Sequence, residues 1–288
     1  MGLVDPERMT LTPEETHRLH LADLAAYGSM YLAATDRIES GRAFIGGPDA
    51  AMAMWNPADE SSAYNTLIGF EAASDPDAAW AAGLAAAREG GARVFGVGLI
   101  EARYGWGTPE RIMAERLELE YEELVWARTL VPGMPSTLDE TWEPRGTPSG
   151  VEIVTRGIDS DVLAETLNKG WEVRPEHGRG PLYASVLGIP GWTHYLALVD
   201  GQAAGAGALF CGHDVALFMV VATDPAFRGR GVQRALIARR MADAVSNGCS
   251  LAAAETVDDN ASPRNFQRAG FRLVHRRLMY RTEISPQP

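Results

Sequence analysis

The sequence predicts an α/β (α+β) fold with two domains, each a mixed β-sheet with helices on both faces. Three observations support this prediction. Residues 151–288 alternate strand and helix patterns, residues 1–130 contain a similar order of elements, and a segment rich in Pro, Gly, Ser and Thr separates them. We therefore expect a domain over 1–130, a linker over 131–150 and a complete domain over 151–288.

Local signals place the elements of the second domain. Asp200-Gly201 lies between two apolar segments and predicts a hairpin turn. Residues 215–223 are strongly apolar and predict a central strand, while Val232 and Leu236 recur at helical spacing. The expected strands are 151–155, 195–199, 203–211, 215–223, 251–256 and 271–282, and the expected helices are 159–169, 181–187, 231–246 and 262–269.

The first domain shows the same order, β-β-β-α-β-α-β, after an N-terminal helix. No residue-level repeat accompanies this order, so the duplication is inferred from the elements alone. The expected helices are 12–31, 77–88 and 108–115, and the expected strands are 42–45, 51–55, 64–70, 92–98 and 118–130.

Composition narrows the classes of function. A formal net charge of -12 argues against a nucleic-acid partner. The chain has no run of about 18 apolar residues and no secretion signal, so we expect no membrane partner and a cytoplasmic location. Cys211 and Cys249 are the two cysteines, and without a CxxC motif or a histidine cluster they predict neither a disulfide framework nor a metal site.

A glycine-rich turn follows the central strand and opens a helix. Its sequence is Arg228-Gly229-Arg230-Gly231. Glycines let a backbone approach an anion closely, and the N–H groups of a helix N-terminus point outward with partial positive charge. This arrangement suits a pyrophosphate, although a solvated basic turn would have the same sequence.

Three motifs in this order resemble the GNAT superfamily of N-acetyltransferases. Residues 228–233 resemble its pyrophosphate loop, Gln/Arg-x-x-Gly-x-Gly/Ala, except that Gln233 takes the last small position. Residues 221–225 are similar to its acetyl-CoA-binding strand, and residues 260–271 to its Asn-containing helix that ends in Gly-Phe. The resemblance extends over about 130 residues of the chain, its second half.

The resemblance implies that acetyl-CoA or another acyl-CoA is the co-substrate, with no metal. A backbone N–H of the strand would polarise the thioester carbonyl. The residues implied in donor binding are Val220, Val221 and Ala222 for the pantetheine arm, Arg228, Gly229, Arg230, Gly231, Val232 and Gln233 for the pyrophosphate, and Asn260 and Asn265 for placing the arm.

The catalytic groups are less well marked. Many family members have a Tyr as general acid where this sequence has Phe266, which we expect to pack in the core. Ser262 or solvent would then protonate the thiolate. Glu255 interrupts an apolar strand and is the first candidate for the general base. The alternatives for the base are Asp224, His213, Asp214, His177 and His194.

The first half resembles a degenerate GNAT repeat that has lost donor binding, as in tandem GNAT proteins. Its strand 64–70 leads into the acidic segment 71–77, which would repel a pyrophosphate. We expect this half to shape the acceptor site. Aromatic residues at Trp55, Tyr64 and 104–106 would line that site or pack in the core.

These observations predict an acyltransferase that moves an acetyl or other short acyl group from coenzyme A to a small-molecule amine by direct attack in a ternary complex. One alternative donor is the phosphopantetheine of an acyl carrier protein. Another alternative is a coenzyme A-binding module without turnover. For the oligomeric state, a homodimer is an alternative to a monomer.

Overall fold

The computed structural model describes residues 8–37, 42–45, 51–57, 62–70, 73–100, 106–131, 150–173, 179–257 and 262–284. It divides into two compact units. Unit 1 comprises residues 1–23 and 125–274, and unit 2 comprises residues 24–124 and 275–288. Of the expected linker, only Val131 and Gly150 lie among the described residues.

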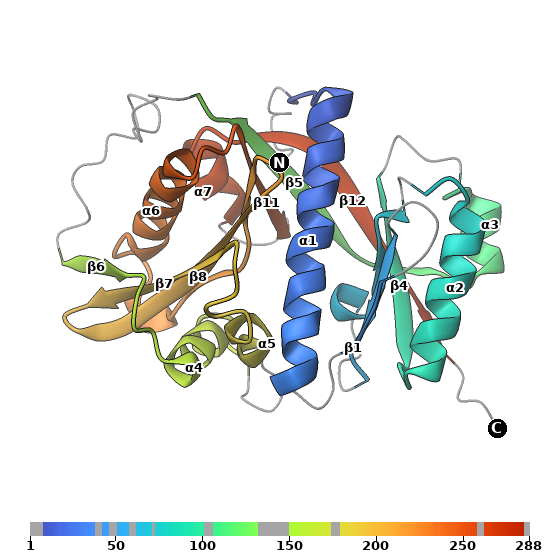
Figure 1. The fold of residues 1–288 in the computed structure, drawn as a ribbon, viewed down its shortest axis with the longest axis horizontal. Coiled ribbons are helices and arrows are strands. Elements are labelled where there is room, and N and C mark those ends of the chain that lie inside the picture. Colours follow the sequence, from blue (N-terminus) through green and yellow to red (C-terminus); the bar gives the residue numbers. More distant parts are fainter. Residues whose placement is uncertain are drawn as a thin grey trace. The chain divides into compact units, whose positions relative to one another are not determined.

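Unit 1 contains a mixed sheet with the strand order β5-β11-β9-β8-β7-β6, and β10 pairs with β8. Helices α4 and α5 cover one face of β7 and β8, and α6 and α7 lie on the other (Figure 1). The elements are β6 (Val151–Val154), α4 (Ser160–Gly170), α5 (Gly180–Ala184), β7 (Trp192–Val199), β8 (Gln202–Gly212), β9 (Val215–Phe218), β10 (Val221–Thr223), α6 (Val232–Ser246), β11 (Leu251–Val257) and α7 (Ser262–Arg268).

Unit 2 contains the strand order β1-β2-β3-β4-β12. Its elements are β1 (Arg42–Ile45), β2 (Met52–Trp55), β3 (Thr66–Ile68), α2 (Pro76–Glu89), β4 (Val94–Ile100) and α3 (Pro109–Ala114). Three elements contribute residues to both units: α1 (Pro13–Arg37), β5 (Glu118–Thr129) and β12 (Arg272–Glu283).

The two units repeat one topology. The strands β1, β2 and β3 pair antiparallel in succession, and β3 then pairs parallel with β4 across α2. The strands β7, β8 and β9 also pair antiparallel, and β9 pairs parallel with β11 across α6. The duplication predicted from element order is therefore confirmed, because the pairing directions agree as well.

The last strand of the sequence differs from the prediction. We expected residues 271–282 to close the sheet of the second half. Residues 277–283 of β12 instead pair antiparallel with β4 in unit 2. The alternating pattern of β12 predicts a strand with one buried face, and this pattern fits any sheet edge that offers a matching apolar face.

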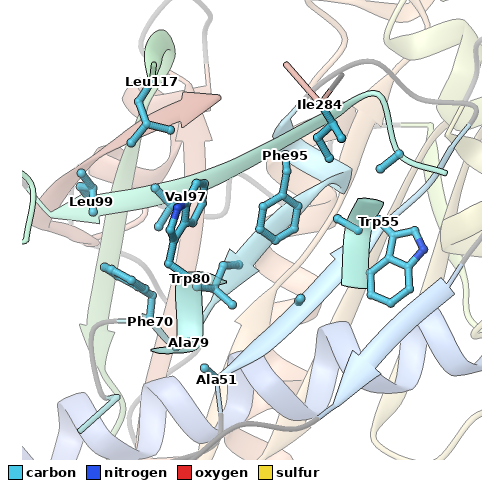
Figure 2. Close-up of a cluster of buried hydrophobic side chains, with 14 residues drawn as sticks. Ala51, Trp55, Phe70, Ala79, Trp80, Phe95, Val97, Leu99, Leu117 and Ile284 are labelled. Carbon is cyan, nitrogen blue, oxygen red and sulfur yellow. The ribbon is translucent and has the colours of Figure 1, made fainter. Parts of the chain in front are cut away.

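The core of unit 2 is rich in aromatic side chains (Figure 2). Trp80 lies 5.5 Å from Phe95 and 5.6 Å from Trp106, measured between ring centroids. Trp55 and Tyr64 are buried as well. These aromatic side chains therefore pack in the core, and residues 104 and 105 lie outside the described residues.

Local sequence signals explain several helix ends. Thr12 and Glu15 form a capping box at the start of α1, with the Thr12 amide donating to the Glu15 carboxylate over 2.8 Å and the Glu15 amide donating to Thr12 Oγ1 over 3.2 Å. Asp159 accepts hydrogen bonds from the first-turn amides of α4. Among the described helices, none is both long and apolar enough to cross a membrane.

Candidate functional site

The central strand of unit 1 is interrupted. The run predicted as one strand, 215–223, breaks at Met219 and Val220 into β9 and β10. The pairing of β9 with β11 ends at Phe218 and Ala254. Among the described strands, β10 pairs with β8 alone, so its other edge is open to an extended ligand.

The register of β10 separates the three residues predicted to pair with pantetheine. The Ala208 amide donates to the Val220 carbonyl over 3.0 Å, and Ala222 lies opposite Ala206. Backbone groups alternate along an antiparallel ladder, so the Val220 carbonyl and the backbone groups of Ala222 share the side that faces β8. The amide and carbonyl of Val221 face the open edge.

The predicted glycine-rich turn joins β10 to α6. Gly229 has φ 76° and Gly231 has φ 81°, both in the left-handed region that favours glycine. Gly231 is the N-cap of α6, and no side chain caps this helix. The amides of Val232 and Gln233 belong to its first turn, where they have no intrahelical acceptor, so they are available to an anion.

Two amides of this turn have partners inside it. The Arg228 amide donates to the Pro225 carbonyl over 3.3 Å, and the Arg230 amide donates to the Phe227 carbonyl over 3.4 Å. Of the amides predicted to hold the pyrophosphate, those at the start of α6 are therefore the best placed.

Both arginine side chains of the turn are ion-paired. Arg228 Nη2 lies 2.8 Å from the Glu172 carboxylate and 3.1 Å from the Gly170 carbonyl. Arg230 Nη2 lies 3.0 Å from the Asp200 carboxylate. Ion pairs with about half-exposed side chains contribute about 0–1 kcal/mol to stability, so a bound anion can compete for these guanidinium groups.

Three predicted site residues form one hydrogen-bonded cluster. Gln233 Nε2 donates to Ser262 Oγ over 3.1 Å, and Asn265 Nδ2 donates to Gln233 Oε1. The side chain of Gln233, which departs from the family pattern, thus links the first turn of α6 to α7. Asn260 lies outside the described residues.

Glu255 lies where β11 leaves β9. It directly follows Ala254, the last residue of β11 that pairs with β9. Its side chain is partly buried, and the next residue, Thr256, is buried and accepts a hydrogen bond from Trp126 Nε1 over 2.9 Å. Successive strand side chains point to opposite faces, so Glu255 and Thr256 point in opposite directions.

Phe266 packs in the core, as predicted. It is 1% exposed, and its ring centroid lies 6.0 Å from that of Phe218 and 5.0 Å from that of Phe271. Its edge-to-face contacts are those favoured by aromatic side chains.

The alternative bases have structural contacts. Asp224 accepts a hydrogen bond from the Ala226 amide over 2.8 Å and shapes the turn. His194 donates to the Tyr183 carbonyl over 3.0 Å, and burial lowers the pKa of His194. Asp214 pairs with Arg18 and Ser250, His213 has φ 52° in a turn, and His177 lies outside the described residues.

The sequence prediction missed Arg240, which is fully buried on α6. Arg240 Nη1 lies 3.3 Å from the Ala208 carbonyl oxygen, 3.4 Å from that of Met219 and 3.5 Å from that of Val220. Burial lowers its pKa to about 10, so it stays protonated at neutral pH. Its position four residues after Leu236, on the apolar face of the helix, is the signal that could have identified it.

Among the described residues, no group of three His, Cys, Asp or Glu side chains could hold a metal ion.

The comparisons with known proteins agree with this geometry. The profile of the acetyltransferase (GNAT) family matches residues 162–271. No curated protein sequence matches the chain. The fold is similar to a tandem GNAT protein from the clavulanic acid biosynthesis pathway, with 16% identity and a TM-score of 0.59 over 97% of this chain and 98% of that chain.

Two bacterial structures share the fold as well. A GCN5-related N-acetyltransferase from Kribbella flavida matches with 15% identity and a TM-score of 0.56, over 90% of this chain and 93% of its own. One from Sphaerobacter thermophilus matches with 20% identity and a TM-score of 0.52, over 68% of this chain and 61% of its own. Residues 162–271 are therefore an acetyltransferase (GNAT) family domain, and the chain as a whole shares the fold of a tandem GNAT protein.

Proposed function

We propose that the second half transfers an acetyl or other short acyl group from coenzyme A to an amine of a small molecule. The observation that carries this proposal is the order of three features along the chain. The open edge of β10 comes first, the left-handed glycines follow, and the uncapped N-terminus of α6 comes last. An extended arm and a pyrophosphate are joined in the same order in coenzyme A. One ligand can therefore use both features.

The donor would lie along this path. The carbonyl of Val221, on the open edge of β10, pairs with the pantetheine arm as in an added strand. The amides at the start of α6 hold the pyrophosphate, where the helix dipole favours negative charge. The cluster of Gln233, Ser262 and Asn265 then lies beside the first turn of that helix.

The reaction proceeds by direct attack in a ternary complex. Glu255 removes a proton from the ammonium group of the acceptor, and the neutral amine nitrogen attacks the thioester carbonyl. The C–N bond forms, the attacking nitrogen loses its second proton to solvent, the C–S bond of the tetrahedral intermediate breaks with the thiolate as leaving group, and the amide product leaves. Ser262, which accepts a hydrogen bond from Gln233, donates a proton to the thiolate and recovers it from solvent.

Calorimetry with three donors tests the binding half of this proposal. Acetyl-CoA, acetyl-phosphopantetheine and acetyl-pantetheine share the arm and differ in their phosphates. We expect acetyl-CoA to bind at least about 10-fold more tightly than acetyl-pantetheine, because the pyrophosphate occupies the helix N-terminus. Equal affinities for acetyl-CoA and acetyl-phosphopantetheine would favour a carrier-protein donor, and equal affinities for all three would refute the pyrophosphate site.

A thiol-release assay with a panel of amines tests the chemical half. Small-molecule amines should release coenzyme A faster than water does, in proportion to enzyme. A panel that includes amino acids, aminoglycosides and peptides would identify the acceptor class. Release at the rate of hydrolysis with every small amine, but not with a peptide, would contradict the small-molecule acceptor.

A further inference from the structure

The buried guanidinium of Arg240 contacts two successive carbonyl groups at the break between β9 and β10. Arg240 Nη1 lies 3.4 Å from the Met219 oxygen and 3.5 Å from the Val220 oxygen. In a regular strand, successive carbonyls point to opposite sides. Their convergence on one nitrogen shows that the backbone is bent here.

The same nitrogen replaces a ladder hydrogen bond. The Ala208 amide donates to the Val220 carbonyl over 3.0 Å. Among the described residues, the return bond from the Val220 amide to the Ala208 carbonyl is absent, and Arg240 Nη1 lies 3.3 Å from that carbonyl oxygen. Arg240 thus holds the bend by taking the acceptor that the Val220 amide would otherwise use.

The orientation of the amides follows from peptide geometry. In a trans peptide the N–H points away from the C=O, and the described chain contains no cis peptide. Holding the Met219 and Val220 carbonyls toward Arg240 therefore turns the amides of Val220 and Val221 away from it. Two successive N–H groups that point to one side form a binding site for negative charge.

We propose that Arg240 is a positioning residue that aims the amides of Val220 and Val221 at the thioester carbonyl oxygen of the acyl donor. This inference rests on the proposed function, because the donor must lie along β10. As negative charge develops on the oxygen, preoriented donors stabilise it without rearrangement. The positive charge of Arg240 behind the two peptides reinforces their dipoles.

Packing alone does not account for this arginine. Its Nη2 atom is buried and has no hydrogen-bond partner in the described structure. Among the described residues no carboxylate forms an ion pair with it, and its guanidinium lies 4.9 Å above the Phe218 ring. An apolar side chain of similar size would fill this space without burying an unpaired charge.

Infrared spectroscopy of bound acetyl-CoA labelled with carbon-13 at the acetyl carbonyl tests the inference directly. We expect the carbonyl stretch to shift to lower frequency on binding to the parent enzyme, and Arg240→Met to lose most of that shift. In the amine assay, Arg240→Met should lower kcat about 10- to 100-fold. The KM of Arg240→Met for acetyl-CoA should stay within about threefold of the parent value. Its Tm should not fall, because the substitution removes a buried charge and keeps the packing.

Two further variants complete the experiment. Arg240→Lys keeps the charge without the planar fork and should show an intermediate shift, so it serves as the test if Arg240→Met does not fold. Arg239→Met removes the neighbouring, partly exposed arginine, which pairs with Asp243, and should keep the parent shift. Failure of the parent to bind acetyl-CoA would overturn the proposed function as well as this inference. Binding without a carbonyl shift, or a full shift in Arg240→Met and Arg240→Lys, would overturn the role of Arg240 alone.

Discussion

The helices α6 and α2 occupy the same place in the two repeats, yet their N-termini are different. Helix α6 begins after Gly231 in the left-handed conformation and has no side-chain cap. Helix α2 begins after Asp75, whose carboxylate accepts from the Ala78 amide over 3.0 Å, and Pro76 and Asp77 follow it. The first terminus has no side-chain cap, whereas the second satisfies an amide with its own carboxylate.

The following strands differ in the same way. In unit 1, β11 continues past its last pair with β9 and carries Glu255 there. In unit 2, every residue of β4, Val94–Ile100, is buried and none is ionisable. The two repeats therefore share a topology and differ in residue type at equivalent places, and we propose that these differences separate a reactive unit from a structural one. Four predictions test this comparison.

The largest effect is expected at Glu255, because β11 carries an ionisable side chain there and the equivalent strand β4 carries none. Glu255→Gln removes the proposed base and should lower kcat about 100-fold or more. The pH–rate profile should change as well, because the proposed base can no longer accept a proton. Glu165→Gln, the same change on the exposed face of α4, should keep the parent profile. An unchanged rate and profile in Glu255→Gln would show that another group is the base.

A transfer of the α2 cap to α6 should abolish donor binding. Gly231→Asp places a carboxylate at the N-cap, where it repels the pyrophosphate, and should weaken acetyl-CoA binding about 100-fold. Gly231→Asn has the same shape and tolerates the left-handed conformation, so it serves as the uncharged control and should lose only a few-fold. Equal losses in both variants, measured by calorimetry, would point to backbone strain rather than charge.

The arginines of the turn should have a smaller effect than its backbone. Arg228→Ala combined with Arg230→Ala should weaken acetyl-CoA binding about 10-fold, because two partly exposed charges are lost. Glu172→Ala combined with Asp200→Ala releases both guanidinium groups and should leave affinity equal or slightly higher. If the arginine double variant binds as tightly as the parent, the backbone amides act alone.

The smallest effect is expected in the repeat that we propose has lost donor binding. Asp75→Ala removes the cap of α2 and should lower the free energy of unfolding by about 1 kcal/mol, measured by urea denaturation. Asp75→Asn keeps an accepting oxygen and should stay close to the parent. Neither variant should change acetyl-CoA affinity. A change in affinity would show that the first repeat contributes to donor binding.

Much of the fold followed from local signals. The sequence Arg228-Gly229-Arg230-Gly231 between an apolar run and a helical pattern predicts the turn, and the structure gives Gly229 and Gly231 left-handed φ angles. Helix α6 is predicted because Val232 and Leu236 recur on one helix face. The predicted hairpin at Asp200-Gly201 is the turn between β7 and β8. Turn and helix signals act within a few residues, and the sequence states them directly.

The sequence by itself determined which unit has the amides and glycines for an anion, because these depend on residue type and short spacing. The tertiary structure decided the break at Met219, the link from Gln233 to α7, and the pairing of β12 with β4. It also decided the burial of Arg240. These features depend on carbonyls, side chains and strand edges that are distant in sequence. An amphipathic pattern determines which face of an element is buried, but it does not determine the element against which that face packs.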